Sequence, residues 1–354
     1  MRLLTRLNRL QRGTRHVLRG FAHRHHPILV HLVVTRRCNL ACTYCNEYDD
    51  VSSPVPLPLL RARADRLAEL GTSAVTLSGG EPLMHPELDL VVGHLRARDM
   101  FATLITNGYY LSREWIERLN RAGLDHLQIS IDNVEPDLVS LKSLRLLEPK
   151  LRWLADHRNF SVSINSVLGS GVKTPEDALE VARRARELGF STSVGIAHDR
   201  QGQLRALSER EMRVYKELRS LEAVRWTRVN GTFQKNLVRG LPNDWSCRAG
   251  ARYLYVDENG LVHYCSQQRG TPGIPLERYG GEDIRREYDS PKGCAPYCTV
   301  NCVQQVAWFD RYRAPQGKPA RAIAMAPGGE RSPGEREEGP GPLGPTPTAD
   351  RAGA

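Results

Sequence analysis

Three cysteines near the start of the chain have the spacing of an iron–sulfur ligand set. Cys38, Cys42 and Cys45 form a C-x3-C-x2-C run directly after the apolar segment 28–34. Three thiolates on one tight loop can hold three irons of a [4Fe–4S] cube and leave the fourth iron open to a ligand that is not protein. Zinc is the alternative, but three thiolates without a histidine at zinc spacing make a poor tetrahedral site. The run therefore predicts a cluster with one open iron.

A glycine pair follows the next predicted strand. Gly79, Gly80 and Glu81 belong to a Ser-Gly-Gly-Glu-Pro sequence about 40 residues after the cysteine run. Glycine lets a backbone approach a ligand closely, and the following proline fixes the path by which the chain leaves the loop. A glycine pair alone is weak evidence, but the order of cysteine run, strand, GGEP loop and helix is specific.

The cysteine run and the GGEP loop together resemble the radical S-adenosylmethionine (SAM) superfamily, and the resemblance covers about residues 27–310. In that superfamily the amine and carboxylate of SAM chelate the open iron. The resemblance implies that Gly79, Gly80 and Glu81 bind SAM, with a backbone carbonyl of the loop receiving the methionine ammonium. It also implies that Tyr44 lies beside the adenosine, although packing over the cluster explains this ring almost as well.

Polar side chains end three further predicted strands, namely Thr106, Ser130 and Asn165. Buried polar groups are costly unless they are paired, so several at one opening indicate ligand contacts. The resemblance implies that Ser130 binds the SAM carboxylate or ribose and that Thr106 and Asn165 lie nearby, with local strand capping as the alternative. Relatives pair SAM with an arginine after this strand. Here the nearest basic residues are Lys142 and Arg145, and the sequence leaves the choice between them open.

Five further cysteines lie in the C-terminal third: Cys247, Cys265, Cys294, Cys298 and Cys302. The first two frame a predicted hairpin in a C-x12-G-x4-C pattern. This pattern resembles the opening of the SPASM/twitch extension, which holds auxiliary [4Fe–4S] clusters in radical SAM enzymes. The resemblance implies one auxiliary cluster, held by Cys247, Cys265 and two or three of the others, because five cysteines leave one thiol to spare. A structural zinc site of four thiolates is the alternative.

Short apolar segments alternate with amphipathic ones between these motifs. The predicted strands are 28–34, 74–78, 101–106, 126–131, 160–167 and 191–197. The helices expected between them are 57–70, 86–98, 112–122, 137–157 and 175–188, with a further helix at 208–221. Repeated strand–helix units predict a parallel sheet with right-handed crossovers. The resemblance narrows this α/β class to a partial (β/α)6 radical SAM barrel with a small Cys-rich C-terminal extension, whose site lies at the C-terminal ends of the strands.

The chain divides into four predicted parts. Residues 1–26 form a basic helix, 27–222 the radical SAM partial barrel, and 223–313 a twitch/SPASM-like iron–sulfur extension. Residues 314–354 form a tail rich in proline and glycine, which we expect to be disordered because it has almost no bulky apolar side chains. The basic helix is expected to pack on the barrel, and a peripheral contact with an anionic membrane or an acidic partner is the alternative.

The charge and the cysteine content limit the class of protein. The net charge is +10, but residues 1–26 contain seven arginines and no acid, so the rest of the chain is nearly balanced. Because positive and negative charges nearly cancel in the rest of the chain, we expect no nucleic-acid partner. No apolar run is long enough to span a membrane, and the start of the chain does not read as a secretory signal. Metal-binding cysteines without an export signal lead us to expect a cytoplasmic protein.

The resemblance implies an enzyme. It would reductively cleave SAM at the [4Fe–4S] cluster to form a 5′-deoxyadenosyl radical, which abstracts a hydrogen from a substrate. A peptide or protein substrate ranks first, and small-molecule or cofactor biosynthesis second. The implied partner is a low-potential electron donor such as a flavodoxin or ferredoxin. A non-catalytic iron–sulfur electron carrier is the alternative from another class, and it would not need the GGEP loop or Ser130. No catalytic side chain is assigned.

Overall fold

The computed structural model describes residues 2–42, 45, 47–138, 140–169, 172–198, 204–221 and 233–313. Tyr44, the predicted boundary between residues 222 and 223, and the predicted tail 314–354 lie outside the described residues. The domain boundaries and the disorder of the tail therefore stay predictions.

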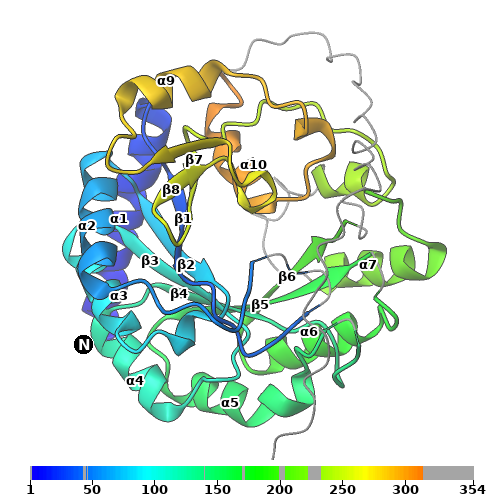
Figure 1. Cartoon of the computed structure of the whole chain (residues 1–354). Coiled ribbons are helices and arrows are strands. Elements are labelled where there is room, and N and C mark those ends of the chain that lie inside the picture. The colour runs from blue at the N-terminus through cyan, green and yellow to red at the C-terminus, as the bar shows by residue number, and fades with distance from the viewer. Residues whose placement is uncertain are drawn as a thin grey trace, which may run out of the picture. The chain divides into compact units, whose positions relative to one another are not determined.

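Six parallel strands in chain order form the main part of the sheet. They are β1 (Leu29–Thr35), β2 (Ala74–Gly79), β3 (Phe101–Thr106), β4 (His126–Ser130), β5 (Ser161–Leu168) and β6 (Ser191–Ile196). The helices that alternate with them are α2 (Leu57–Glu69), α3 (Leu88–Ala97), α4 (Arg113–Ala122), α5 (Leu144–His157), α6 (Asp177–Glu187) and α7 (Glu209–Leu221). Figure 1 shows α2 to α6 along the outside of the curved sheet. The α/β class and the unclosed parallel barrel sheet are confirmed.

Strand alternation gives the sheet two different faces, because successive side chains of a strand point to opposite sides. On β3, Ala102 and Leu104 are fully buried in a core shared with apolar residues of α2 to α5. Ile105 on β3 and His31 on β1 are partly exposed and line a cavity instead. The helices therefore stabilise one face of the sheet and leave the other face for a site.

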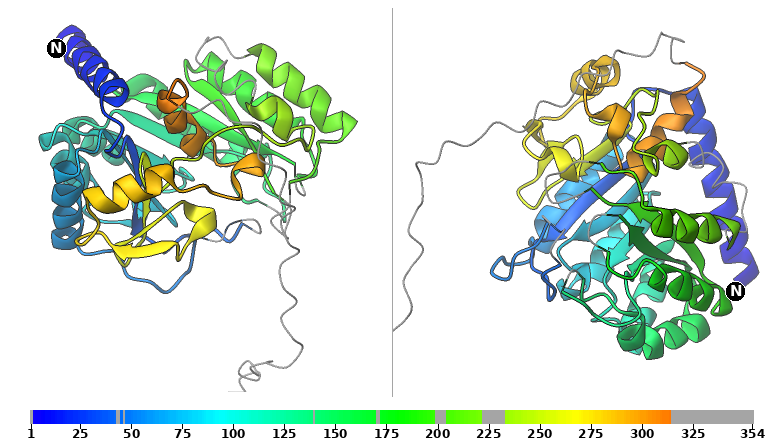
Figure 2. Two further views of the ribbon diagram at one scale, coloured as in Figure 1. Left: turned by 90° about the horizontal axis from the view of Figure 1, so that it is seen from above. Right: turned by 90° about the vertical axis from the view of Figure 1, so that its right-hand side faces the viewer.

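The C-terminal hairpin extends the same sheet beyond β1. Strand β7 (Tyr253–Val256) pairs in parallel with β1, β8 (Leu261–His263) is antiparallel to β7, and β9 (Pro272–Pro275) is antiparallel to β8. The sequence predicted this hairpin but not its partner. In both views of Figure 2 the hairpin, in yellow, lies next to the barrel strands. The cysteine-rich extension thus begins beside the strand that leads to Cys38.

Short helices complete the C-terminal region. They are α9 (Gly281–Asp289) and α10 (Asn301–Ala307), with single 3-10 turns η2 (Ser266–Gln268), η3 (Ala295–Tyr297) and η4 (Trp308–Asp310). A further 3-10 turn, η1 (Pro82–Met84), follows the GGEP loop. The helix predicted at 86–98 begins two residues later than expected, because α3 starts at Leu88.

The N-terminal helix α1 (Arg2–Ala22) is fixed to the rest of the fold by a buried arginine. Arg252 is fully buried, and its Nε lies 2.9 Å from Asp310 Oδ2. Its Nη1 donates to the carbonyl of His23 at 2.7 Å, and its Nη2 donates to the carbonyl of Gly20. Leu18 on α1 remains exposed, so a peripheral membrane contact stays a prediction. No helix among the described residues has the length and apolar composition needed to cross a membrane.

The loop between β4 and α5 differs from the prediction. The helix predicted at 137–157 begins only at Leu144. The backbone N–H groups of Asp132 and Asn133 donate to the carbonyl of Lys142, at 3.1 and 3.2 Å, and Asn133 Nδ2 donates to the carbonyl of Ser140 at 3.0 Å. Such local bonds from Asp and Asn compete with helix formation. Through these bonds the loop folds back, and Lys142 lies beside the end of β4.

Candidate active site

A cavity of about 310 Å³ opens at the C-terminal ends of β1 to β4. This volume is in the range of small-molecule sites. The site residues predicted from the sequence that line it are Cys38, Cys42, Cys45, Gly79, Gly80, Thr106, Ser130 and Cys302. The fold therefore brings the cysteine run, the glycine pair and two of the polar strand ends to one place.

The glycine pair allows the GGEP loop to lie directly against the chain that leads to Cys38. A Cβ atom on Gly79, whose φ is +133°, would lie 2.0 Å from the carbonyl oxygen of Thr35. A Cβ on Gly80 would lie 2.2 Å from the carbonyl oxygen of Arg36 and 2.4 Å from that of Arg37. The Gly80 N–H also donates to the Thr35 carbonyl at 2.8 Å. No other residue type fits at either position without moving the cysteine loop.

Glu81 connects the GGEP loop to the end of β3. Its buried carboxylate accepts hydrogen bonds from the N–H of Leu83 at 2.9 Å, the hydroxyl of Thr106 at 2.6 Å and the N–H of Asn107 at 2.7 Å. Burial raises the pKa of Glu81. Glu81 is not among the cavity-lining residues, and the Thr106 hydroxyl is already bound to it. Both residues hold the loops of the cavity in position.

Asn107 links this arrangement to the cysteine run, and the sequence-based site did not include it. Its Nδ2 donates to Asn39 Oδ1 at 2.9 Å and lies 3.8 Å from Cys38 Sγ. Asn107 also lines the cavity. The sequence feature that points to Asn107 is its position directly after a strand, in the sequence Thr-Asn-Gly.

Asn165 and Ser130 have different surroundings although β4 and β5 pair them in register. Ser130 lines the cavity, whereas Asn165 is not among its lining residues. The Asn165 Oδ1 accepts a hydrogen bond from the hydroxyl of Ser193 on β6, at 2.9 Å. The structure therefore gives no support to a ligand contact for Asn165.

Lys142, not Arg145, is the basic residue at the cavity. Lys142 lines it, is 18% exposed, and its Nζ lies 3.9 Å from Asp132 Oδ2. The side chain of Arg145 is 74% exposed and pairs with Glu135 at 2.6 Å. The late start of α5 explains the difference, because it leaves Lys142 in the loop at the cavity and puts Arg145 on the first turn of the helix.

Three further lining residues were not identified from the sequence: His31, Glu47 and Tyr253. Burial lowers the pKa of His31 to about 4, so its ring is neutral at physiological pH. Burial raises the pKa of Glu47, whose carboxyl accepts a hydrogen bond from Tyr255. The rings of His31 and Tyr253 are 5.3 Å apart. The pairing of β7 with β1 brings Tyr253 to the cavity, and no sequence pattern predicts that pairing.

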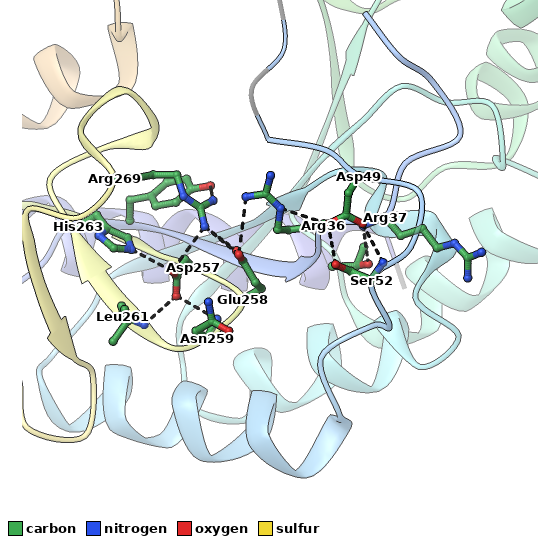
Figure 3. A network of polar contacts seen from close by, with 12 residues as sticks. Arg36, Arg37, Asp49, Ser52, Asp257, Glu258, Asn259, Leu261, His263 and Arg269 are labelled. Atoms are coloured by element: carbon green, nitrogen blue, oxygen red, sulfur yellow. Dashed lines mark hydrogen bonds and ion pairs between the residues drawn. The ribbon is translucent and has the colours of Figure 1, made fainter. Parts of the chain in front are cut away.

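An ionic network joins the cysteine loop to the hairpin turn (Figure 3). Arg36 Nη1 lies 3.6 Å from Glu258 Oε1, and Arg36 Nε lies 3.4 Å from Asp49 Oδ2. Arg269 Nη2 donates to Glu258 at 2.8 Å and lies 3.5 Å from Asp257 Oδ2. The network connects residues on both sides of the β1–β7 boundary, so the position of the cysteine loop depends on the C-terminal extension.

Four of the C-terminal cysteines form a mutually close set: Cys247, Cys265, Cys294 and Cys298. In every pair of this set the charge of one thiolate raises the pKa of the other, in addition to the larger effect of burial. Burial raises the pKa of Cys247 to about 12 and that of Cys265 to about 11. Cys302 lines the cavity and also packs against the cluster that contains Cys247 and Cys265.

The donors fit the iron–sulfur group that the sequence predicts. All eight cysteines are free, and sulfur is the ligand that iron–sulfur clusters use. Among the described residues, no three His, Cys, Asp or Glu side chains are already placed to hold a single metal ion. In the described part of the chain, Ser78 Oγ is buried at the cavity wall without a hydrogen-bond partner, and it is available to a ligand.

The family model of the radical SAM superfamily matches residues 32–198. Residues 32–198 are thus similar to a radical SAM domain. This match covers most of β1, all of β2 to β6, and the predicted residues of the cavity wall except Cys302. Members of this superfamily bind SAM and a [4Fe–4S] cluster, and the cysteine run at the cavity agrees with that chemistry.

Relatives of known activity match parts of this chain. It is 36% identical over 119 residues to the PqqA peptide cyclase of Xanthomonas campestris pv. campestris, covering 31% of this chain and 30% of that protein. It is 34% identical over 155 residues to the PqqA peptide cyclase of Xanthomonas oryzae pv. oryzae, covering 40% of each. The chain thus matches less than half the length of these relatives.

Two solved structures have the same fold. Streptococcus suis SuiB bound to S-adenosylmethionine superposes with a TM-score of 0.55 at 15% identity, covering 79% of this chain and 72% of that one. Native anSMEcpe with bound AdoMet and Cp18Cys peptide superposes with a TM-score of 0.53 at 14% identity, covering 81% and 98%. At this identity the similarity establishes the fold and not the substrate.

Proposed function

We propose that this protein is a radical SAM enzyme that modifies a peptide. The observation that carries the proposal is the cavity in which the cysteine run, the GGEP loop and Ser130 meet. Relatives support the peptide as substrate class: PqqA peptide cyclases match in sequence, and SuiB has been solved with the precursor peptide SuiA. The wall of the cavity also includes the β7 strand, so the C-terminal extension takes part in enclosing the substrate.

The residues at the cavity have distinct roles in this proposal. Cys38, Cys42 and Cys45 would hold the cluster, and the GGEP loop with Ser130 would bind SAM. When bound, this pair of cofactors supplies the 5′-deoxyadenosyl radical that takes a hydrogen atom from an unactivated carbon. The protein orients the substrate and excludes water, because a misplaced or hydrated radical would react elsewhere. A low-potential donor such as a flavodoxin or ferredoxin would provide the electron.

We also propose one auxiliary [4Fe–4S] cluster, held by the close set of Cys247, Cys265, Cys294 and Cys298. Iron and acid-labile sulfide after anaerobic reconstitution should amount to about eight irons per chain. The Cys38/Cys42/Cys45→Ala triple variant should retain about four. A content of about four that falls to near zero would mean that the C-terminal cysteines hold zinc or nothing.

The activity itself is tested without knowledge of the substrate. Reconstituted protein incubated anaerobically with SAM and dithionite should release 5′-deoxyadenosine and methionine, and the triple variant should release neither. An intact cluster without any 5′-deoxyadenosine would favour the electron-carrier alternative instead.

Lys142 should contribute to SAM affinity. A cation at the cavity wall can pair with the SAM carboxylate, as the arginine of relatives does. We expect Lys142→Ala to raise the dissociation constant for SAM about tenfold, which corresponds to about 1.4 kcal/mol. The matched control is Arg145→Ala, which should bind SAM as wild type does because Arg145 is exposed and paired with Glu135. Calorimetry on cluster-loaded protein measures both, and equal effects of the two variants would contradict the assignment.

A further inference from the structure

The lining of the cavity has one part that the proposed cofactor site does not use. The cysteine loop and the ends of β2 to β4 supply the residues proposed to hold the cluster and SAM. The rest of the lining includes His31 on β1, Tyr253 on β7, and Ser266 and Gln267 on the turn η2. Glu47 also lines the cavity and has no role in the proposed cofactor site. We call these five residues the substrate wall.

Glu47 is the acidic residue of this lining, and Lys142 is the basic one. Lys142 lies 3.9 Å from Asp132 Oδ2 and is proposed to pair with the carboxylate of SAM. Glu47 is different, because its Oε1 is buried and accepts no hydrogen bond from any residue that the structure describes. Leaving a buried oxygen of this kind without a donor is costly, and such groups are rare in folded proteins. A bound molecule is therefore expected to supply the donor.

The protein holds Glu47 in place from two sides. Its backbone N–H donates to the sulfur of Cys45, and its carboxyl is hydrogen-bonded to the hydroxyl of Tyr255. Arg269 Nη1 lies 3.4 Å from the same hydroxyl oxygen. A guanidinium can only donate, so the Tyr255 proton is directed to Glu47. Arg269 itself is bound to Glu258 at 2.8 Å. One oxygen of Glu47 is thus fixed by the protein, and the other is left for a ligand.

We propose that Glu47 binds the cationic side chain of a lysine or arginine in the substrate and so selects a basic peptide. This rests on the proposed function, which makes a peptide the molecule that enters the cavity. An ammonium or guanidinium supplies the donor that Oε1 lacks, and its charge complements the carboxylate. The rings of Tyr253 and His31 lie 5.3 Å apart in the same lining and offer apolar surface to the aliphatic stem of such a side chain.

The first measurement separates the substrate from SAM, which also carries positive charge on its sulfonium and ammonium groups. Calorimetry on cluster-loaded Glu47→Gln should give a dissociation constant for SAM within about twofold of wild type. The iron content should equal that of wild type. Binding of SAM weakened about tenfold, or a loss of iron, would overturn the proposal, because Glu47 would then serve the cofactor or the cysteine loop.

The second measurement determines which peptides are bound. Cluster-loaded protein is immobilised anaerobically with SAM, and an mRNA-displayed library of random peptides is selected on it. Wild type should enrich lysine and arginine over glutamine about tenfold at one peptide position, and Glu47→Gln should not. The matched control is Glu117→Gln, whose side chain is exposed on α4, and it should select as wild type does.

The outcomes distinguish this proposal from the proposed function. Equal enrichment of basic residues by wild type and Glu47→Gln would overturn the role of Glu47 and leave a peptide-modifying enzyme. Selection by wild type without enrichment of basic residues would do the same. If wild type retained no peptide above bare resin but still formed 5′-deoxyadenosine from SAM, the peptide substrate would be wrong, and the role of Glu47 would fall with it.

Discussion

Replacing Gly80 with alanine should lower the rate of 5′-deoxyadenosine formation at least 100-fold. The added Cβ would lie 2.2 Å from the Arg36 carbonyl oxygen and 2.4 Å from that of Arg37. These are backbone atoms and cannot turn aside as a flexible side chain can, so the GGEP loop and the cysteine loop must move apart. A displacement of about 1 Å between reacting groups can cost on the order of 100-fold in rate. Product analysis by mass spectrometry, with iron content measured in parallel, checks the expectation.

The matched control for this variant is Gly93→Ala. Gly93 lies in α3, and a Cβ there would meet nothing within 4 Å. Alanine is favoured over glycine inside a helix, so this variant should keep its activity and gain up to about 1 kcal/mol of stability. Wild-type product formation by Gly80→Ala would show that close approach of the two loops is not needed, and the SAM site would have to be assigned elsewhere.

Replacing Glu81 with glutamine should lower the free energy of unfolding by about 1–3 kcal/mol, the cost of leaving a buried donor unsatisfied. The carboxylate accepts from the N–H groups of Leu83 and Asn107 and from the Thr106 hydroxyl. An amide offers one oxygen and one NH2 group, so one buried N–H group would face another donor. Because Asn107 contacts Asn39 and Cys38, the disturbance should also reach the cysteine run and lower 5′-deoxyadenosine formation.

Glu117→Gln is the matched control for this change. This is the same substitution on α4, where the Glu117 side chain is 66% exposed. It should change the free energy of unfolding by no more than about 0.5 kcal/mol. Urea unfolding compares the two variants. If Glu81→Gln unfolded at the wild-type urea concentration, the carboxylate would not be holding the GGEP loop to β3.

Local patterns were sufficient to predict the order of the strands and the main parts of the site. The cysteine run and the GGEP loop directly follow β1 and β2, and Ser130 ends β4. In a parallel sheet the C-terminal ends of the strands lie at one edge. Residues that follow successive strands therefore meet, and their convergence could be predicted without coordinates.

The sequence left open, or placed differently, the features that depend on hydrogen bonds between particular residues. Bonds from Asp132 and Asn133 to the backbone of residues 140–142 delay α5, and this selects Lys142 over Arg145 for the cavity. Asn165 has the same polar character as Ser130, but its amide bonds to Ser193 on the next strand. Sequence patterns give the period of a strand and not the partner of each side chain, so neither outcome could be read from the chain alone.

The sequence by itself determined the chemistry of this protein: a thiolate set with an open iron position, a glycine loop beside it, and an α/β barrel to carry them. These depend on residue type and short spacing, which are local properties. Only the tertiary structure decided which side chains share the cavity. The parallel pairing of β7 with β1 places Tyr253 at the same cavity as the cysteine run. That pairing joins segments more than 200 residues apart. Its hydrogen bonds are between main chains, so the residue types do not show which two strands pair.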